Sequence, residues 1–205
     1  MRSDSIVFAI AGMCFGIILG WVIGTEQAAK RTAAVLQPAA AAPQQAAGTR
    51  QPPALDEGQV QALTTVLKSD PNNAGAIVKL ANLYFDAERY QDAIDWYLKG
   101  LKIEPKNVDA STDLGVSYYY SGNTDAALKQ FDYSLKLDPR HTKTLLNQGI
   151  VLAFGKRDLK GATDAWEKVV QIAPDSPEAQ AAKQGLQGIA AAAGRGGAPA
   201  PAAGG

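Results

Sequence analysis

The chain contains few of the residues that build covalent cross-links and catalytic centres. Cys14 is its only cysteine and His141 its only histidine. A single cysteine excludes an internal disulfide and a multi-cysteine metal site, and a single histidine excludes a metal site that needs two. No glycine-rich phosphate loop joins a strand to a helix, because Gly194, Gly196 and Gly197 belong to a C-terminal tail. We therefore predict a protein that is not an enzyme and binds no cofactor or metal.

The single histidine follows Pro139 and Arg140 in a predicted turn. No serine or cysteine that the sequence can place lies beside it, so it lacks the nucleophile that a catalytic triad needs. We expect His141 to be an exposed turn residue.

Neither sign of charge is in excess, since the chain holds 20 Lys and Arg residues and 20 Asp and Glu residues. A protein that binds the phosphate backbone of DNA or RNA needs a basic stripe along one face, and the sequence has none. Nucleic acid is therefore not an expected partner.

Residues 6–24 carry no charged side chain. As a helix this run would be about 28 Å long, close to the ~30 Å hydrocarbon thickness of a bilayer. A cleaved signal peptide would have a shorter apolar core and a small-residue cleavage site after it. Met13 is a poor residue before a lipid-modified Cys14. We predict an uncleaved single-pass membrane anchor at 6–24, behind a short tail at 1–5.

Glycine recurs at every fourth position of the predicted anchor, at Gly12, Gly16, Gly20 and Gly24. Residues four apart lie along one helix face, and small residues there let a second helix backbone approach closely. The alternative is that glycine is simply common in membrane helices. The repetition favours a helix-packing face, for self-association or for contact with another membrane protein.

Ala, Gln and Pro dominate residues 25–55, where few larger aliphatic side chains could form a core. We predict a disordered, flexible linker that lets the following domain stand off the membrane. The few Lys and Arg residues near the anchor hardly fix its orientation. The layout resembles that of bacterial proteins with a short basic start, one helix and a Pro/Ala linker. We therefore expect a bacterial inner (cytoplasmic) membrane protein with a periplasmic rather than a cytoplasmic domain.

Four prolines beyond the linker fall at nearly constant spacing. Pro71, Pro105, Pro139 and Pro174 are separated by 34, 34 and 35 residues. A period of this length is typical of stacked helix pairs, in which each pair buries its apolar face against its neighbours.

Residue types recur at fixed offsets within this period. Aromatic residues stand eight positions before the later prolines, at Tyr97, Phe131 and Trp166, and alanine stands twelve before, at Ala93, Ala127 and Ala162. Small residues in the first half of the period are Ala81, Gly115 and Gly149. We expect the aromatic residues to form the core and the small residues to let paired helices approach.

The first helix of each period reads Leu80-Ala81-x-x-Tyr84, then Leu114-Gly115-x-x-Tyr118, then Gln148-Gly149-x-x-Leu152. Together with the alanine, aromatic and proline positions, these motifs resemble the tetratricopeptide repeat (TPR). The resemblance implies an all-α solenoid of helix pairs with terminal capping helices, preceded here by the transmembrane helix and the linker. It also implies that protein partners bind a concave surface lined by the first helices.

The period sets the expected boundaries of the repeats. The predicted segments are an N-terminal capping half repeat at 56–71, repeats at 74–107, 108–141 and 142–176, a capping helix at 177–193 and a disordered tail at 194–205. Asp56 and Ser176 are the expected N-caps of the capping helices, and Pro177 suits a first helical position. Repeat three has one extra residue, which we expect to lengthen the turn at 155–160 and to loosen the helix pairing.

Repeat register also predicts the residues of the concave surface. They are Asn82, Phe85, Asp86, Asp109, Thr112, Asp113, Val116, Tyr119, Tyr120, Lys143, Leu146, Asn147, Ile150 and Phe154. Exposed aromatic side chains are typical anchors for a peptide or helix, although some could instead pack between helices. The mixture of acidic and aromatic residues suits an amphipathic segment with some basic side chains.

One subgroup of the family clamps a peptide carboxylate with Lys and Asn side chains. Asn82 and Lys143 match that clamp, whereas Val78, Asp113 and Asn147 stand where it needs Lys, Asn and Arg. This departure argues against recognition of chaperone tails.

Two functions from different classes remain open. The first is a membrane-tethered adaptor whose groove binds a partner peptide or helix. The second is a self-associating scaffold of a membrane complex, and quenching of Trp96, expected on the outer face of a second helix, would report its assembly. A layout similar to that of membrane-anchored cytochrome c maturation proteins suggests a third function, a chaperone that holds an apo-protein tail.

Overall fold

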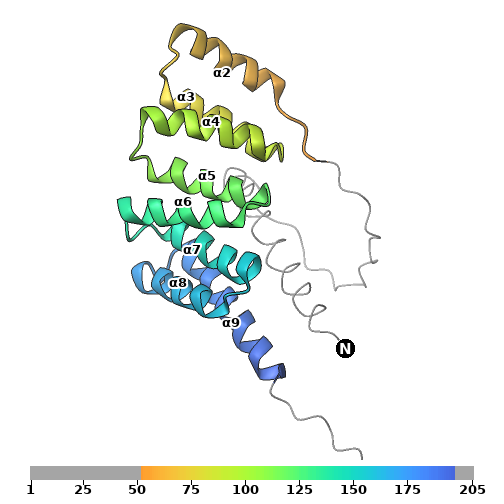
Figure 1. Cartoon of the computed structure of the whole chain (residues 1–205), viewed down its shortest axis with the longest axis vertical. Helices are drawn as coiled ribbons and strands as arrows, with labels where there is room; N and C mark the ends of the chain where they lie inside the picture. Colours follow the sequence, from red (N-terminus) through yellow and green to blue (C-terminus); the bar gives the residue numbers. More distant parts are fainter. Residues whose placement is uncertain (1–51, 197–205) are drawn as a thin grey trace, which may run out of the picture. The chain divides into compact units, whose positions relative to one another are not determined.

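The computed structural model describes residues 52–196, which form a stack of antiparallel helices (Figure 1). The predicted anchor at 6–24 with its glycine face, the linker up to residue 51 and the tail from residue 197 lie outside the described residues. Within 52–196, no helix is long and apolar enough to cross a membrane.

The helices follow one another as pairs joined by short turns. Their bounds are α2 (Glu57–Ser69), α3 (Ala74–Asp86), α4 (Tyr90–Ile103), α5 (Val108–Tyr120), α6 (Thr124–Leu137), α7 (Thr142–Ile150), η1 (Val151–Lys156), α8 (Leu159–Ile172) and α9 (Pro177–Gly196). Three pairs, α3 with α4, α5 with α6, and α7–η1 with α8, pack against one another in chain order. The described part of the chain is therefore an all-α repeat array.

Side-chain caps start the first helices of repeats one and two. The Asn73 side chain accepts a hydrogen bond from the Ala76 backbone N–H, and Asn107 accepts one from Ala110, at 2.9 and 3.0 Å. Each bond satisfies a backbone donor that the first helical turn leaves without a partner. The Asn before the first helix therefore starts that helix at the same point of repeats one and two.

The predicted core aromatics are buried. Tyr97, Phe131 and Trp166 are only 2 %, 0 % and 3 % exposed. A Cβ atom added to Gly115 would lie 2.5 Å from the Phe131 ring, and one added to Gly149 would overlap the Trp166 ring. Both predictions are confirmed, because all three rings are buried and, in repeats two and three, the ring of the second helix rests directly on the backbone of the first helix.

The extra residue of repeat three lies inside the first helix, so the expected longer turn at 155–160 is wrong. In repeat one, the Arg89 N–H that begins the second helix bonds the Tyr84 carbonyl, five residues back. In repeat three, the Asp158 N–H bonds the Leu152 carbonyl, six residues back. The turns share a middle residue with left-handed backbone, which is Glu88, Gly122 or Arg157. The turn keeps its form because the π-helical segment η1 absorbs the insertion.

The N-terminal capping helix α2 begins where the sequence predicts, since the Asp56 carboxylate accepts a bond from the Gln59 N–H at 2.9 Å. It packs on α3, yet none of its residues is buried. Leu63 and Leu67 are half-buried, while Val66 is 44 % exposed. This helix therefore shields the first repeat only partly.

The C-terminal capping helix α9 begins at Pro177, and the Ser176 hydroxyl caps the Ala179 N–H at 3.1 Å. Leu186 and Ile189 pack against the core of repeat three. The helix continues to Gly196, so the boundaries predicted at 193 and 194 are too early. The alanines that precede this end favour helix strongly enough to extend it.

Candidate protein-binding groove

Acidic and basic side chains from the first helices meet on one surface, which we call the first-helix groove. Asp113 on α5 forms an ion pair with Lys143 on α7 at 2.7 Å. Asp86 on α3 lies close enough to Asp113 for their charges to repel, since each ionised carboxylate disfavours the other. The structure therefore brings predicted residues of all three repeats together, although they are about 30 positions apart per repeat in the sequence.

Asn82 is held in this groove by the core. The buried Tyr97 hydroxyl donates a hydrogen bond to the Asn82 side-chain oxygen at 2.6 Å. Burial, followed by the charges of Asp113 and Asp86, raises the pKa of Tyr97 far above its usual value, so the hydroxyl stays protonated. The bond fixes the Asn82 amide, whose oxygen is consequently engaged.

The Asp113–Lys143 pair is partly shielded from water. Their side chains are 24 % and 42 % exposed. Burial raises the pKa of Asp113, while the neighbouring Lys143 ammonium opposes that shift and Asp109 adds to it. Lys143 is therefore charge-neutralised by a residue of the groove itself, which matters for the kind of ligand that the groove can hold.

The pKa of Asp86 is raised, first by burial and then by repulsion from Asp113. A carboxyl whose pKa is raised in the folded state stabilises the fold most below its ordinary pKa of 3.8 and loses that contribution as the pH rises. We therefore expect Asp86→Asn to raise the free energy of unfolding at neutral pH, with a gain that disappears below about pH 3.8. Urea unfolding at both pH values measures this difference. An equal gain at both values would contradict the electrostatic cause.

Thr112 was expected in the groove, but the structure buries it between α5 and α7. Its side chain is 0 % exposed. The hydroxyl lies 2.8 Å from the Val108 carbonyl and 2.6 Å from the Thr144 hydroxyl. This position is occupied by an inter-repeat hydrogen bond, so Thr112 cannot contact a ligand.

His141 was expected to be an exposed turn residue, and this expectation is also wrong. Its side chain is 20 % exposed. The ring nitrogen Nδ1 lies 2.7 Å from the Thr144 hydroxyl, and Nε2 lies 3.3 Å from the Asp109 carboxylate. The ring joins the start of α7 to α5. Sequence reasoning missed this because Asp109 lies in the preceding repeat.

Aromatic rings gather at one end of the groove. The Tyr120 ring stacks on Tyr90 at a centroid distance of 5.1 Å and meets the edges of Phe85 and Tyr119 at 5.7 and 5.8 Å. All four residues are half-buried. Tyr90 begins the second helix α4 and was not among the predicted groove residues. Its position in the repeat is Thr124 in repeat two and Leu159 in repeat three, so no periodic signal singles it out.

The remaining apolar groove residues also pack partly against the core. Val116 and Tyr119 contact the cluster of Phe131, and Leu146, Ile150 and Phe154 contact the cluster of Trp166. Asn147 is half-buried, and its amide donates to the Lys143 carbonyl at 2.8 Å. These half-buried side chains are thus held by the core, while Asn82, Asp86 and Asp109 are the most exposed of the predicted residues.

Comparisons with known proteins agree with this architecture. A family model described as TPR repeat matches residues 81–122, and one described as tetratricopeptide repeat matches residues 112–177. The comparison with curated proteins gave no match.

Several solved structures share the fold. The crystal structure of MamA is 23 % identical over 67 % of this chain and 91 % of that chain, with a TM-score of 0.55. The first TPR of Spaghetti (RPAP3), bound to the HSP90 peptide SRMEEVD, is 25 % identical over 59 % of this chain and 96 % of that chain, with a TM-score of 0.51. A tetratricopeptide repeat protein from Parabacteroides merdae is 19 % identical over 68 % of this chain and 56 % of that chain, with a TM-score of 0.58.

The tetratricopeptide repeat is a non-enzymatic scaffold that generally mediates protein–protein interaction. The helix pairs, the buried aromatic positions and both family matches agree: residues 81–177 of this chain are similar to tetratricopeptide repeats.

Proposed function

We propose that the protein is a membrane-tethered adaptor whose first-helix groove binds a partner peptide or helix that carries basic side chains. The observation that carries this proposal is the Asp113–Lys143 ion pair at 2.7 Å. It places a carboxylate where a carboxylate-binding groove would need an uncharged donor.

The charge of the groove argues for a basic ligand. The RPAP3 domain is bound to a peptide rich in acidic residues. In the present groove, Lys143 is neutralised by Asp113, and the exposed carboxylates of Asp86 and Asp109 lie on either side along α3 and α5. A cation beside Asp86 and Asp113 would also relieve their mutual repulsion, which adds to the effect of burial in raising the pKa of Asp86.

The aromatic end of the groove supplies the apolar part of the contact. The half-buried rings of Phe85, Tyr119 and Tyr120 are held in place by T-shaped contacts with one another. Such pre-ordered rings bind an apolar side chain without the entropic cost of ordering long flexible groups. An amphipathic segment with one apolar and one basic face fits this division.

The membrane tether is the second part of the proposal. It rests on the uncharged run at 6–24 and the linker at 25–55, whose composition favours an anchor and a flexible connection. We propose that this anchor lies in the bacterial inner membrane, with the repeat array on the periplasmic side.

A photo-crosslinking experiment tests the groove. A photoreactive amino acid replaces Asn147 in the full-length protein, and crosslinked segments are identified by mass spectrometry after irradiation of living cells. We expect partner segments with basic and apolar residues. In the double variant Asp86→Lys/Asp109→Lys, their yield should fall by about tenfold, because rim charges steer association. The compartment of the partner reports the topology.

The matched control is Asp95→Lys/Glu167→Lys, which makes the same charge change at exposed positions of the second helices α4 and α8. It should leave the yield unchanged. Replacing these acidic residues is preferable to Tyr120→Ala, because the Tyr120 ring packs on Tyr90 and its removal would also change the packing of the repeats. Equal crosslink yields from both double variants would refute the proposal that the partner binds the first-helix groove. Crosslinks to segments of the protein itself would instead favour a self-associating scaffold.

A further inference from the structure

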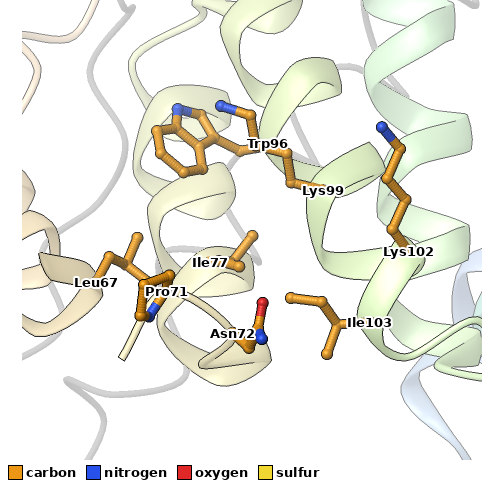
Figure 2. A pocket seen from close by; sticks show the side chains of 8 residues that line it. All are labelled: Leu67, Pro71, Asn72, Ile77, Trp96, Lys99, Lys102 and Ile103. Carbon is orange, nitrogen blue, oxygen red and sulfur yellow. The ribbon is translucent and has the colours of Figure 1, made fainter. Parts of the chain in front are cut away.

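A second groove lies on the second-helix side of repeat one, between the α2–α3 turn and α4. Its volume is about 420 Å³. Figure 2 shows Ile77 of α3 at its centre, with Leu67 and Pro71 on one side and Ile103 on the other. Ile103 is 38 % exposed although it is apolar. None of the residues that line this end groove belongs to the first-helix groove.

The corresponding place in repeat two is filled by a tyrosine. Tyr133 stands six residues before Pro139, and its hydroxyl donates to the Pro105 carbonyl at 2.9 Å, so the ring bridges α6 and the preceding turn. Lys99 stands six residues before Pro105 and takes the place of that tyrosine in repeat one. The end groove is open because no ring reaches from this position to Pro71.

Two ammonium groups lie along the edge of the end groove. The Lys99 amine sits 3.8 Å from the centroid of the Trp96 ring, and Lys102 lies one turn further along α4 (Figure 2). Within residues 52–196, neither lysine forms an ion pair. Exposed ammonium groups beside apolar side chains favour a ligand that supplies carboxylates along with an apolar side chain.

We propose that the end groove binds an acidic amphipathic segment of a partner protein. An apolar side chain of that segment enters over Ile77, beside Leu67 and Ile103, while its carboxylates pair with Lys99 and Lys102. The chain's own linker has the wrong charge for this role, since residues 25–51 contain Glu26 against Lys30, Arg31 and Arg50. The two grooves thus take ligands of opposite charge, and this second site does not depend on the first.

A displayed library of random short peptides, selected on the full-length protein in detergent, tests the end groove. We expect a class of enriched peptides in which acidic residues flank one large apolar residue. Binding of that class should fall by about tenfold in Lys99→Glu/Lys102→Glu, since two charge-assisted contacts become repulsive. Trp96→Ala should weaken the same class, because the ring positions the Lys99 amine.

The matched control is Lys129→Glu/Lys136→Glu on α6, where both lysines are exposed and Lys136 occupies the repeat position of Lys102. This variant and Asp86→Lys/Asp109→Lys should retain binding of the acidic class. The proposal is overturned if no acidic class is enriched, or if the α6 variant loses binding as much as the α4 variant. It is also overturned if sedimentation shows that the α4 variant instead dissociates an oligomer, because the groove would then bind a second copy.

Discussion

Phe131→Ala is expected to lower the free energy of unfolding by about 4 kcal/mol, as large-to-small changes of fully buried aromatics do. Phe131 is 0 % exposed, and it packs with Ala127 and Val151 between repeats two and three. Its ring also covers the backbone at Gly115, where it would lie 2.5 Å from an added Cβ. Removal of the ring therefore opens a cavity that the glycine cannot fill.

Urea unfolding followed by circular dichroism measures this loss. Leu159→Ala is the matched control, because Leu159 is large and apolar but 47 % exposed. We expect it to cost less than about 1 kcal/mol, since little apolar surface is removed from the interior. Similar losses from both variants would mean that Phe131 does not anchor the contact between the repeats.

Gly149→Ala is expected to lower the free energy of unfolding by about 2 kcal/mol, because a single added methyl group overpacks a rigid site. The added Cβ would overlap the Trp166 ring. That ring cannot move away, because its far side lies against Gly185 of α9, where an added Cβ would be only 2.5 Å from the ring. Its N–H also donates a hydrogen bond to the Leu146 carbonyl at 3.1 Å. The glycines on both sides thus set the spacing of α7, α8 and α9.

Gly194→Ala on α9 is a control for which we expect no loss in the free energy of unfolding. Nothing lies within 4 Å of a Cβ at this position. Alanine in a helix is favoured over glycine by about 0.5–1 kcal/mol, so this variant should be neutral or more stable. Trp166→Phe should offset part of the cost of Gly149→Ala in a double-mutant cycle, because the smaller ring leaves room for the methyl group. Additive losses would contradict a direct clash.

Phe131→Ala and Gly149→Ala are expected to act on the proposed binding surface as well as on stability. In a repeat array each helix pair contacts mainly its neighbours, so a change of spacing at one interface propagates along the first helices. Lys143 on α7 reaches Asp113 on α5 across such an interface. Loss of the Phe131 contact is therefore expected to separate the ion pair on which the groove's charge depends.

The sequence by itself determined the repeat architecture, because its signals are local and recur. Prolines, small residues and aromatics at fixed offsets specify where helices end, where backbones approach and which rings are buried. Tyr97 and Trp166 follow this rule, and the caps at Asp56 and Ser176 depend only on residues three positions away. Such information needs no knowledge of the neighbouring repeat.

The tertiary structure alone decided the details of the two proposed binding surfaces, because they arise from contacts between repeats. Thr112 is buried against the next repeat, where its hydroxyl forms a hydrogen bond with the Thr144 hydroxyl. The extra residue of repeat three lies in a π-helical segment, which preserves the turn that follows it. The pattern of residue types does not show where an inserted residue is accommodated. The sequence predicts no special role for Lys99. It lies at the edge of a groove because, unlike Tyr133 in repeat two, it places no ring against the preceding turn. Side-chain packing across the repeat interface, rather than the period, therefore selects which surfaces remain open to a partner.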